Sequence, residues 1–349
     1  MKRIGVIGHF GGNQFFADGQ TVKVKSLVEA FKQFAPDVII DKVDTFYAKK
    51  SPLKFICSFI KCIIIDRKII FFPATNSRKV LFPFFYYLGK CSVKEFYHDC
   101  IAGSMSKHLK ERPKWVKYLG SYKANWMESP EEVRLLKEMG LGNVSYMPNF
   151  KHLNPLSEKE LSEIVYKKPY KFCTFSRIEP LKGIEDALIA IKEVNKVYPN
   201  SAYLDIYGPI QPGSEEWFNE VLSKYNDVCH YCGVVEPNES VDTVKNYVSL
   251  LFPTQYFTEG MPGTIVDAMF AGVPVISRRW MWCDNMIKDR YNGLVYEFDH
   301  PENLLPILLE VVSDINIIKQ MKHNCIVESD KYAAKPTIMR ILKEMNIKN

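Results

Sequence analysis

The 349-residue sequence lacks a regular cysteine framework, a long hydrophobic run and a strong excess of one charge. Its nine cysteines are an odd number, and the one Cys-x-x-Cys pair, Cys229 and Cys232, has no second pair to complete a zinc site. We therefore expect reduced thiols and a cytoplasmic protein. The longest apolar stretch, residues 55–72, is interrupted by four charged side chains, and the N-terminal apolar run is too short for a signal peptide. We expect no membrane-spanning helix.

A dinucleotide-binding fingerprint is also missing. The early glycines at positions 5, 8, 11 and 12 do not fit Gly-x-Gly-x-x-Gly. Asp41 or Asp44 ends the second predicted strand, where an NAD-binding acid would lie, but without the glycine pattern we disfavour a dehydrogenase.

Charge is unevenly distributed along the chain. The net formal charge is only +6, yet residues 1–165 carry 26 basic and 16 acidic side chains. Residues 45–98 hold ten basic and two acidic side chains, together with thirteen Phe and Tyr residues. Cations beside apolar anchors favour an interface with anionic lipid. No nucleic-acid-binding motif accompanies them, so we expect no nucleic-acid partner.

Strand-like and helical segments alternate along the chain. Strands are predicted at residues 3–7, 38–43, 68–72, 95–98, 171–175, 202–207, 228–234, 248–252 and 274–277, and helices at 20–34, 184–197 and 263–271. A polar segment, residues 151–168, separates the two series. The pattern predicts an α/β protein with two Rossmann-like, doubly wound domains that face each other across a cleft, at 1–160 and 161–330.

Two loops of the second half combine charged side chains with a helix start. Arg177 and Lys182 follow a predicted strand in one short loop, an arrangement suited to a diphosphate, although solvated surface cations would look the same. The helix that begins at Gly263 and Thr264 exposes amide donors, which form an anion site.

Two carboxylates flank that helix start. Glu259 precedes the helix and Asp267 lies about one turn inside it. Both can accept hydroxyl groups beside an anion held at the amides. A phosphate that bears a sugar fits this description.

The first half offers two weaker signals. Gly11, Gly12 and Gly19 precede the first helix, and their small size lets backbone amides approach a phosphate or a sugar. His98 and Asp99 end the fourth predicted strand, so we expect both to reach the cleft floor, with Asp99 a candidate base on the acceptor side.

The blocks of the second half resemble the retaining family 4 glycosyltransferases, which have the GT-B fold of two Rossmann-like domains. The resemblance rests on Arg177 with Lys182-Gly183, Glu259-Gly260-x-Pro262, the acid eight residues after Glu259, Ala268-Met269 and Gly272-x-Pro274-Val275. The opening Gly8-His9-Phe10-Gly11-Gly12, with Gly19-Gln20-Thr21, resembles members that build bacterial capsular polysaccharide, exopolysaccharide or O-antigen.

The resemblance implies roles for the donor-side residues. Arg177 and Lys182 would hold the donor pyrophosphate, Glu259 would contact the hydroxyls of the donor sugar, and the amides of residues 263–265, including Ile265, would support a phosphate. The second acid of the family is usually Glu and binds the nucleotide ribose; here it is Asp267, shorter by one methylene.

The resemblance also implies a role for His98, which would contact the donor sugar near its reacting carbon. The C-terminal helix, residues 331–349, would pack back on the first domain, with Ile338, Ile341, Leu342 and Met345 at helical spacing.

The implied activity is transfer of a sugar from a UDP- or GDP-linked donor to a saccharide acceptor, with retention, in bacterial surface polysaccharide synthesis. We expect neither a metal nor another cofactor, because no Asp-x-Asp cluster is present. The basic lobe favours a lipid-linked acceptor and peripheral attachment to the cytoplasmic face of the membrane. Two alternatives stay open: a nucleotide-sugar 2-epimerase on the same architecture, and a catalytically weak glycosyltransferase-like auxiliary subunit, which Asp267 would suit.

Overall fold

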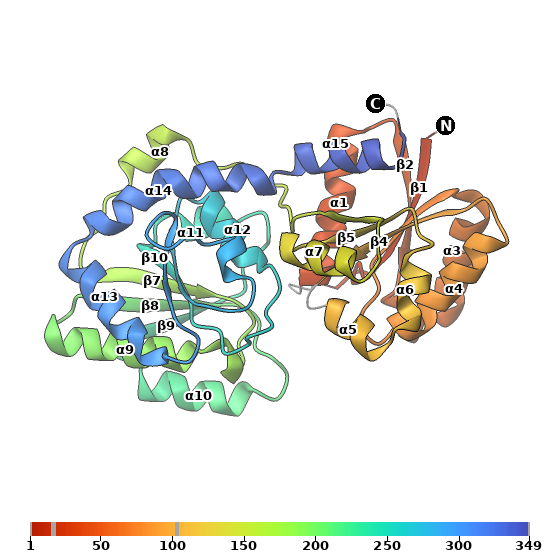
Figure 1. The fold of residues 1–349 in the computed structure, drawn as a ribbon. Coiled ribbons are helices and arrows are strands. Elements are labelled where there is room, and N and C mark those ends of the chain that lie inside the picture. The colour runs from red at the N-terminus through yellow and green to blue at the C-terminus, as the bar shows by residue number, and fades with distance from the viewer. Residues whose placement is uncertain (1, 15–18, 102–104, 348–349) are drawn as a thin grey trace. The chain divides into compact units, whose positions relative to one another are not determined.

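The computed structural model describes residues 2–14, 19–101 and 105–347. The chain folds into two compact units, Met1–His152 with Ala333–Asn349, and Leu153–Tyr332. The chain passes from the first unit to the second after His152. This boundary lies within the polar segment 151–168 and a few residues before the predicted boundary at residue 160. Each unit holds a six-stranded sheet, and every strand pair recorded between neighbours is parallel, so the predicted α/β class with two doubly wound sheets is confirmed (Figure 1).

The first unit has the strand order β2-β1-β3-β4-β5-β6. Its strands are β1 (Lys2–Gly8), β2 (Val38–Asp44), β3 (Lys68–Phe71), β4 (Glu95–Cys100), β5 (Ala124–Met127) and β6 (Val144–Tyr146). Its helices are α1 (Gly19–Phe34), α2 (Tyr47–Lys50), α3 (Pro52–Ile65), α4 (Arg78–Lys90), α5 (Met105–Glu111), α6 (Lys114–Leu119), α7 (Pro130–Glu138) and α15 (Ala334–Glu344).

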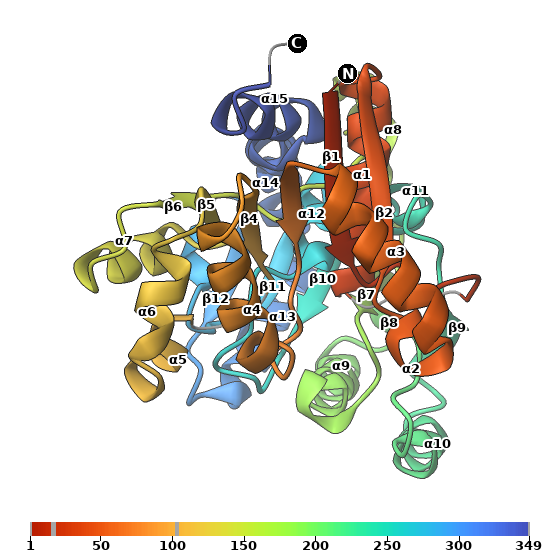
Figure 2. The ribbon, with the colours of Figure 1, turned by 90° about the vertical axis from the view of Figure 1, so that its right-hand side faces the viewer.

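Helices cover both faces of this sheet, which is why its strands are near-continuous apolar runs. One core cluster joins the sheet to α1 and α15, and another joins it to α3, α4, α5, α6 and α7. Figure 2 looks toward this unit and shows α3 and α4 in front of the strands.

The C-terminal helix α15 is grouped with the first unit. It packs beside α1 (Figure 1), and Ile338, Ile341, Leu342 and Met345 are at most 2% exposed. Trp126 Nε1 donates a hydrogen bond of 2.6 Å to Glu344 Oε2, which ties α15 to β5 as well.

The second unit has the strand order β12-β11-β10-β7-β8-β9. Its strands are β7 (Tyr170–Phe175), β8 (Ala202–Tyr207), β9 (Cys229–Gly233), β10 (Ser249–Phe252), β11 (Val275–Arg278) and β12 (Gly293–Tyr296). Its helices are α8 (Glu158–Glu163), α9 (Ile184–Val197), α10 (Glu215–Lys224), α11 (Ser240–Val244), α12 (Gly263–Phe270), α13 (Leu304–Ser313) and α14 (Asn316–Ser329), with 3₁₀ turns η1 (Pro180–Lys182), η2 (Cys283–Asn285), η3 (Pro301–Asn303) and η4 (Asp330–Tyr332).

The register of this sheet decides where its loops meet. β7 and β10 are neighbours, with Phe172 opposite Ser249 and Cys173 opposite Leu250. Because the two strands are parallel, the loops that follow them leave from the same edge of the sheet. These are the two loops in which the charged residues were predicted.

Three further expectations concern chemistry and the membrane. All nine cysteines fall in the described ranges and are free thiols. No described helix has the length and apolar character needed to cross a bilayer. Among the described residues, no group of three or more His, Cys, Asp or Glu side chains could hold a metal ion.

Candidate functional site

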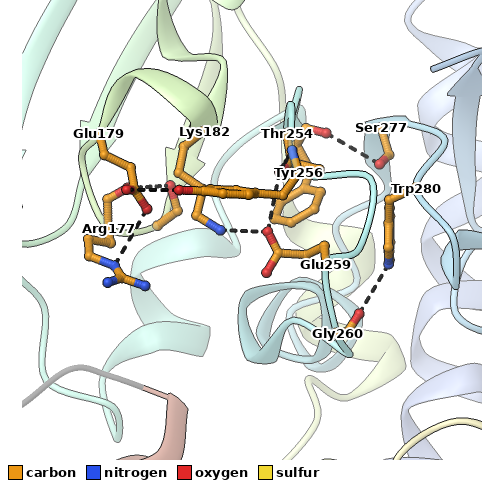
Figure 3. A network of polar contacts seen from close by, with 11 residues as sticks. Arg177, Glu179, Lys182, Thr254, Tyr256, Glu259, Gly260, Ser277 and Trp280 are labelled. Carbon is orange, nitrogen blue, oxygen red and sulfur yellow. Dashed lines mark hydrogen bonds and ion pairs between the residues drawn. The ribbon is translucent and has the colours of Figure 1, made fainter. Parts of the chain in front are cut away.

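Lys182 and Glu259, from the loops after β7 and β10, form an ion pair. The Lys182 ammonium lies 2.5 Å from Glu259 Oε2, and Thr254 Oγ1 donates to the same oxygen over 3.2 Å (Figure 3). The side chains of Lys182 and Glu259 are 11% and 20% exposed, so both charges remain accessible to a ligand. Sequence spacing predicted both residues, and the structure brings them together.

A glycine allows the two loops to approach so closely. Gly183 has φ = +72° and is the N-cap of α9. A Cβ at this position would collide with the carbonyl oxygen of Pro253, at the start of the other loop. Only glycine combines this left-handed backbone with this contact.

Tyr256 and Glu179 connect the loops a second time. The Tyr256 hydroxyl donates to Glu179 Oε2 over 3.1 Å, and the Lys182 ammonium is 5.0 Å from the centre of the Tyr256 ring. Burial, together with the Glu179 carboxylate, raises the pKa of Tyr256, which keeps it a hydrogen-bond donor at neutral pH. Sequence reasoning missed both residues, since neither belongs to a motif.

Arg177 is the most exposed charged group of the cluster. Its side chain is 53% exposed, its Nε lies 3.7 Å from Glu179 Oε1, and its Nη1 donates to Gln211 Oε1 over 3.2 Å. Figure 3 shows the guanidinium below the Glu179 carboxylate. An exposed guanidinium with such light restraint can turn to a bidentate anion.

The start of α12 lies directly after the Glu259 loop. Pro262 is its N-cap, and no side chain caps it. We predicted that the Ile265 amide supports a phosphate, but it already donates to the Pro262 carbonyl over 3.1 Å. The amides of Gly263 and Thr264 precede the first hydrogen bond of the helix. The Thr264 hydroxyl oxygen is buried and has no recorded hydrogen-bond partner. An unpaired buried hydroxyl at a helix start favours an anionic ligand there.

Asp267 lies inside α12 and is 3% exposed. Its Oδ1 accepts a hydrogen bond of 3.0 Å from the Ser240 hydroxyl on α11. The predicted ribose contact of Asp267 stays a prediction, and the structure adds Ser240 as the group that orients this carboxylate.

The loop that carries Glu259 is fixed at its end by Trp280. The Trp280 Nε1 donates to the Gly260 carbonyl over 3.1 Å (Figure 3).

The glycine loop of the first unit is organised by an aspartate. Gly11 and Gly12 have positive φ angles of 80° and 59°. The Gly12 amide donates to Asp44 Oδ2 over 2.8 Å, and the Phe10 amide donates to Asp44 Oδ1 over 2.9 Å. The Gly12 amide is therefore engaged by Asp44, not open to a phosphate as predicted, while Gly19 is exposed at the start of α1.

His98 does not reach a surface, contrary to expectation. Its side chain is fully buried, stacked on Phe71 and in edge contact with Phe82, with ring centres 5.3 and 5.1 Å apart. Burial, aided by the Arg78 charge, lowers the pKa of His98 to about 3. The described geometry gives its predicted sugar contact no support.

Asp99 is likewise buried, in an ion-pair cluster. The Lys23 ammonium lies 2.6 Å from Asp99 Oδ1 and 2.9 Å from Glu128 Oε1, and Lys23 and Asp99 are each 1% exposed. Burial raises the pKa of Asp99 to about 6 although Lys23 opposes the shift. The carboxylate is enclosed in this unit, so the geometry gives no support to Asp99 as an acceptor-side base, and that role stays a prediction.

The segment that carries the loop cluster matches a known family. Residues 158–327, just under half of the chain, match the family model described as glycosyl transferases group 1. The matched segment contains Arg177, Lys182, Glu259 and Asp267, the residues that carry the resemblance seen in the sequence.

Curated relatives agree with the family over part of the chain. The chain is 26% identical over 168 residues to the GtfA subunit of a UDP-N-acetylglucosamine–peptide N-acetylglucosaminyltransferase from Streptococcus agalactiae, covering 48% of this chain and 31% of that protein. It is 21% identical over 164 residues to an uncharacterized glycosyltransferase from Methanocaldococcus jannaschii, covering 46% of this chain and 41% of that protein. The matched stretches thus span less than half of either relative.

Solved structures resemble the whole chain. Sucrose-phosphate synthase from Thermosynechococcus elongatus superposes with a TM-score of 0.76 at 13% identity, covering 99% of this chain and 98% of that chain. Anabaena HepE in complex with UDP superposes with a TM-score of 0.75 at 13% identity, covering 99% and 100%. These likenesses establish the GT-B fold, and the segment that matches the group 1 family model lies in the second of its two Rossmann-like units.

Proposed function

We propose that this protein transfers a sugar from a UDP-linked donor to a saccharide acceptor. The Lys182–Glu259 ion pair beside the start of α12, within a group 1 domain, carries the proposal. It sets a cation for a diphosphate next to a carboxylate for sugar hydroxyls. UDP is our choice of nucleotide because the structural neighbour HepE was solved with UDP, and the relative from Streptococcus agalactiae is named for a UDP-sugar donor.

In this mechanism the donor site stabilises the leaving group. Arg177, Lys182 and the first amides of α12 face the negative charge that grows on the β-phosphate as the glycosidic bond breaks. Glu259 accepts hydroxyls of the donor sugar and holds Lys182 in place through the 2.5 Å ion pair. These groups leave no electrostatic task for a metal ion, so we propose a metal-independent reaction.

Retention and the acceptor are further parts of the proposal. The carboxylates of the loop cluster are already engaged, Glu259 by Lys182 and Thr254, and Glu179 by Tyr256 and Arg177. Neither is an evident nucleophile, so we favour attack by the acceptor on the face that the nucleotide leaves. The basic, aromatic-rich lobe of residues 45–98 supports a lipid-linked acceptor, at the cytoplasmic face of a membrane, in bacterial surface polysaccharide synthesis.

The test pairs nucleotide binding with turnover. The first experiment measures the melting temperature of the protein with UDP, GDP, ADP or TDP, in magnesium and in EDTA. The second measures release of UDP from UDP-sugars. UDP should raise the melting temperature in both buffers. Lys182→Ala should weaken UDP binding about 10- to 100-fold, since a hydrogen bond to a charged group is lost. Lys196→Ala, which removes an exposed, ion-paired lysine of α9, is the matched control.

Glu259→Gln separates sugar contact from nucleotide contact. UDP should still bind to this variant, whereas affinity for the intact UDP-sugar and turnover should both fall. If no nucleotide binds to the wild type, the donor site is refuted. Binding without turnover would favour the auxiliary subunit, and epimerised donor without transfer would identify a 2-epimerase.

A further inference from the structure

Helix α3 exposes an unusually apolar face. Of its 14 residues only Cys62 is buried, although eight of the 14 are Leu, Ile or Phe. Leu53, Ile56, Ile60 and Ile64 are 78%, 47%, 50% and 71% exposed. Their spacing of three or four residues aligns them in one stripe along the helix. Such a stripe on a surface helix marks a contact site.

Helix α4 extends this apolar surface. Val80, Phe84 and Tyr87 are 69%, 41% and 61% exposed. The rings of Phe59 on α3 and Phe84 on α4 lie 5.7 Å apart, so the two helices are in contact through these side chains. We call the outer sides of α3 and α4 the α3–α4 face.

The charge around the α3–α4 face has one sign. Residues 45–94 contain ten Lys and Arg residues and a single acid, Asp66. Asp66 is fully buried, so this segment presents no acidic side chain to its surroundings. The face therefore combines apolar anchors with a rim to which residues 45–94 contribute exposed cations and no exposed acid.

A cationic pocket adjoins the end of α3. It has a volume of about 380 Å³, and its lining includes Arg67, Lys90, Lys94 and Lys123 together with one acid, Glu95. The Lys94 ammonium donates to the carbonyls of Ile64 and Asp66 over 3.0 and 2.9 Å, so the pocket wall is fastened to the C-terminal end of α3.

We propose that the α3–α4 face docks on an anionic lipid bilayer, with α3 lying in the interfacial plane and the pocket holding a lipid phosphate. The aliphatic stripe would enter the boundary between headgroups and acyl chains, and the lysines would attract the anionic surface. The inference rests on the proposed function only where it places a lipid-linked acceptor at the membrane. Binding to the bilayer itself needs no transferase activity.

A second copy of the chain fits this face poorly. Symmetric self-association brings the same patch of each subunit together, so the cations of the rim would oppose each other. A bilayer with anionic headgroups supplies the opposite charge and accepts the stripe at the same time. Charge complementarity therefore selects the membrane.

The experiment is cosedimentation of the full chain with vesicles. Vesicles of phosphatidylglycerol and phosphatidylcholine should bind the protein, those of phosphatidylcholine alone should bind it weakly, and added salt should release it. The double variant Ile60→Glu/Ile64→Glu should bind at least about tenfold more weakly. Ile189→Glu/Val197→Glu, which changes two exposed aliphatic residues of α9, is the matched control and should bind normally.

The pocket is tested by Lys90→Gln and Lys123→Gln. Each should weaken binding about fivefold, while Lys196→Gln should not. Soluble glycerol phosphate should raise the melting temperature of the wild type and leave that of Lys90→Gln/Lys123→Gln unchanged. Bound vesicles should also slow alkylation of the exposed Cys57 on α3, with Cys232 in the second unit as internal reference.

Three outcomes would overturn the inference. Glycerol phosphate could bind without any vesicle binding, which would make the pocket a site for a free anion. The wild type could form a dimer that Ile60→Glu/Ile64→Glu dissociates, which would make the face a protein interface. Equal binding by the glutamate variant would remove α3 from the contact. The UDP-induced rise in melting temperature, measured on the same variants, reports the donor site separately.

Discussion

At the scale of single residues, the neighbours of His98 define its tautomer. Asn125 Nδ2 donates to the Leu119 carbonyl over 2.9 Å, so the oxygen of this amide faces His98 Nδ1 at 3.1 Å. The imidazole must therefore carry its proton on Nδ1. Nε2 is then an unprotonated nitrogen, buried and without a recorded partner. Protonating it would place a charge among aromatic rings.

This geometry predicts a stability loss in acid. The pKa of His98 is lowered from 6.5 to about 3, mainly by burial, so between these values the unfolded chain binds a proton that the folded chain refuses. Stability from this group is complete above pH 6.5 and falls with pH by about 1.4 kcal/mol per unit toward pH 3. In urea titrations from pH 7 to pH 4, His98→Leu should lose less stability than the wild type.

The comparison of slopes isolates His98 from other titrating groups. The matched control is His300→Leu, which removes an exposed imidazole that pairs with Glu302. Equal slopes for wild type and His98→Leu would show that His98 accepts a proton in the folded state.

The sequence predicted which side chains lie close together where the order of the parallel strands alone determines their positions. Arg177, Lys182 and Glu259 follow neighbouring parallel strands, so their loops had to share one edge of the sheet. His98 failed because strand alternation separates two faces but does not say what covers each. Here Phe82 of α4 closes the face to which His98 points. Tyr256 could not be found, since its partner Glu179 is 77 residues away.

At the scale of elements, pattern length decided what could be predicted. Strand β8 and helix α9 have the bounds predicted from sequence, because each combines a long periodic run with clear ends. β5, β6 and β12, with three or four residues each, were not predicted, although the equally short β3, β10 and β11 were. Their pairing partners, rather than local sequence, define them.

Helix α15 gives a prediction at this scale. Leu342 is 2% exposed and packs in the cluster shared by β1, α1 and α15. Leu342→Ala should destabilise the first unit by about 2–5 kcal/mol, because it leaves a cavity that a short helix tied down at Trp126 cannot close. Chemical denaturation followed by Trp126 fluorescence in an otherwise Trp-substituted chain would measure the loss.

The neighbouring residue supplies the control. Lys343 is exposed on the same helix, so Lys343→Ala should change stability by less than about 0.5 kcal/mol. A small effect for both variants would mean that α15 contributes little to the first unit.

At the scale of the whole molecule, the chain crosses between its two units twice. The first unit is closed by residues from both ends of the sequence, whereas the second is one continuous segment, Leu153–Tyr332. The sequence pattern placed the linker within residues 151–168, and the family resemblance supplied the return of the C-terminal helix. The loop cluster and Asp267, all between residues 177 and 267, lie entirely within the continuous unit.

This division predicts how a nucleotide stabilises the protein. A ligand that binds one unit should stabilise that unit by mass action, by about 2.7 kcal/mol at about 100 times its Kd. In calorimetry, UDP should therefore raise the transition of the second unit and leave that of the first unchanged. Leu342→Ala should do the reverse and lower only the transition temperature of the first unit. Lys182→Ala should abolish the effect of UDP. Without ligand, Lys182→Ala should move neither transition temperature by more than a few degrees. If UDP and Leu342→Ala instead shift one common transition, the two units unfold together, and their interface carries a large part of the stability.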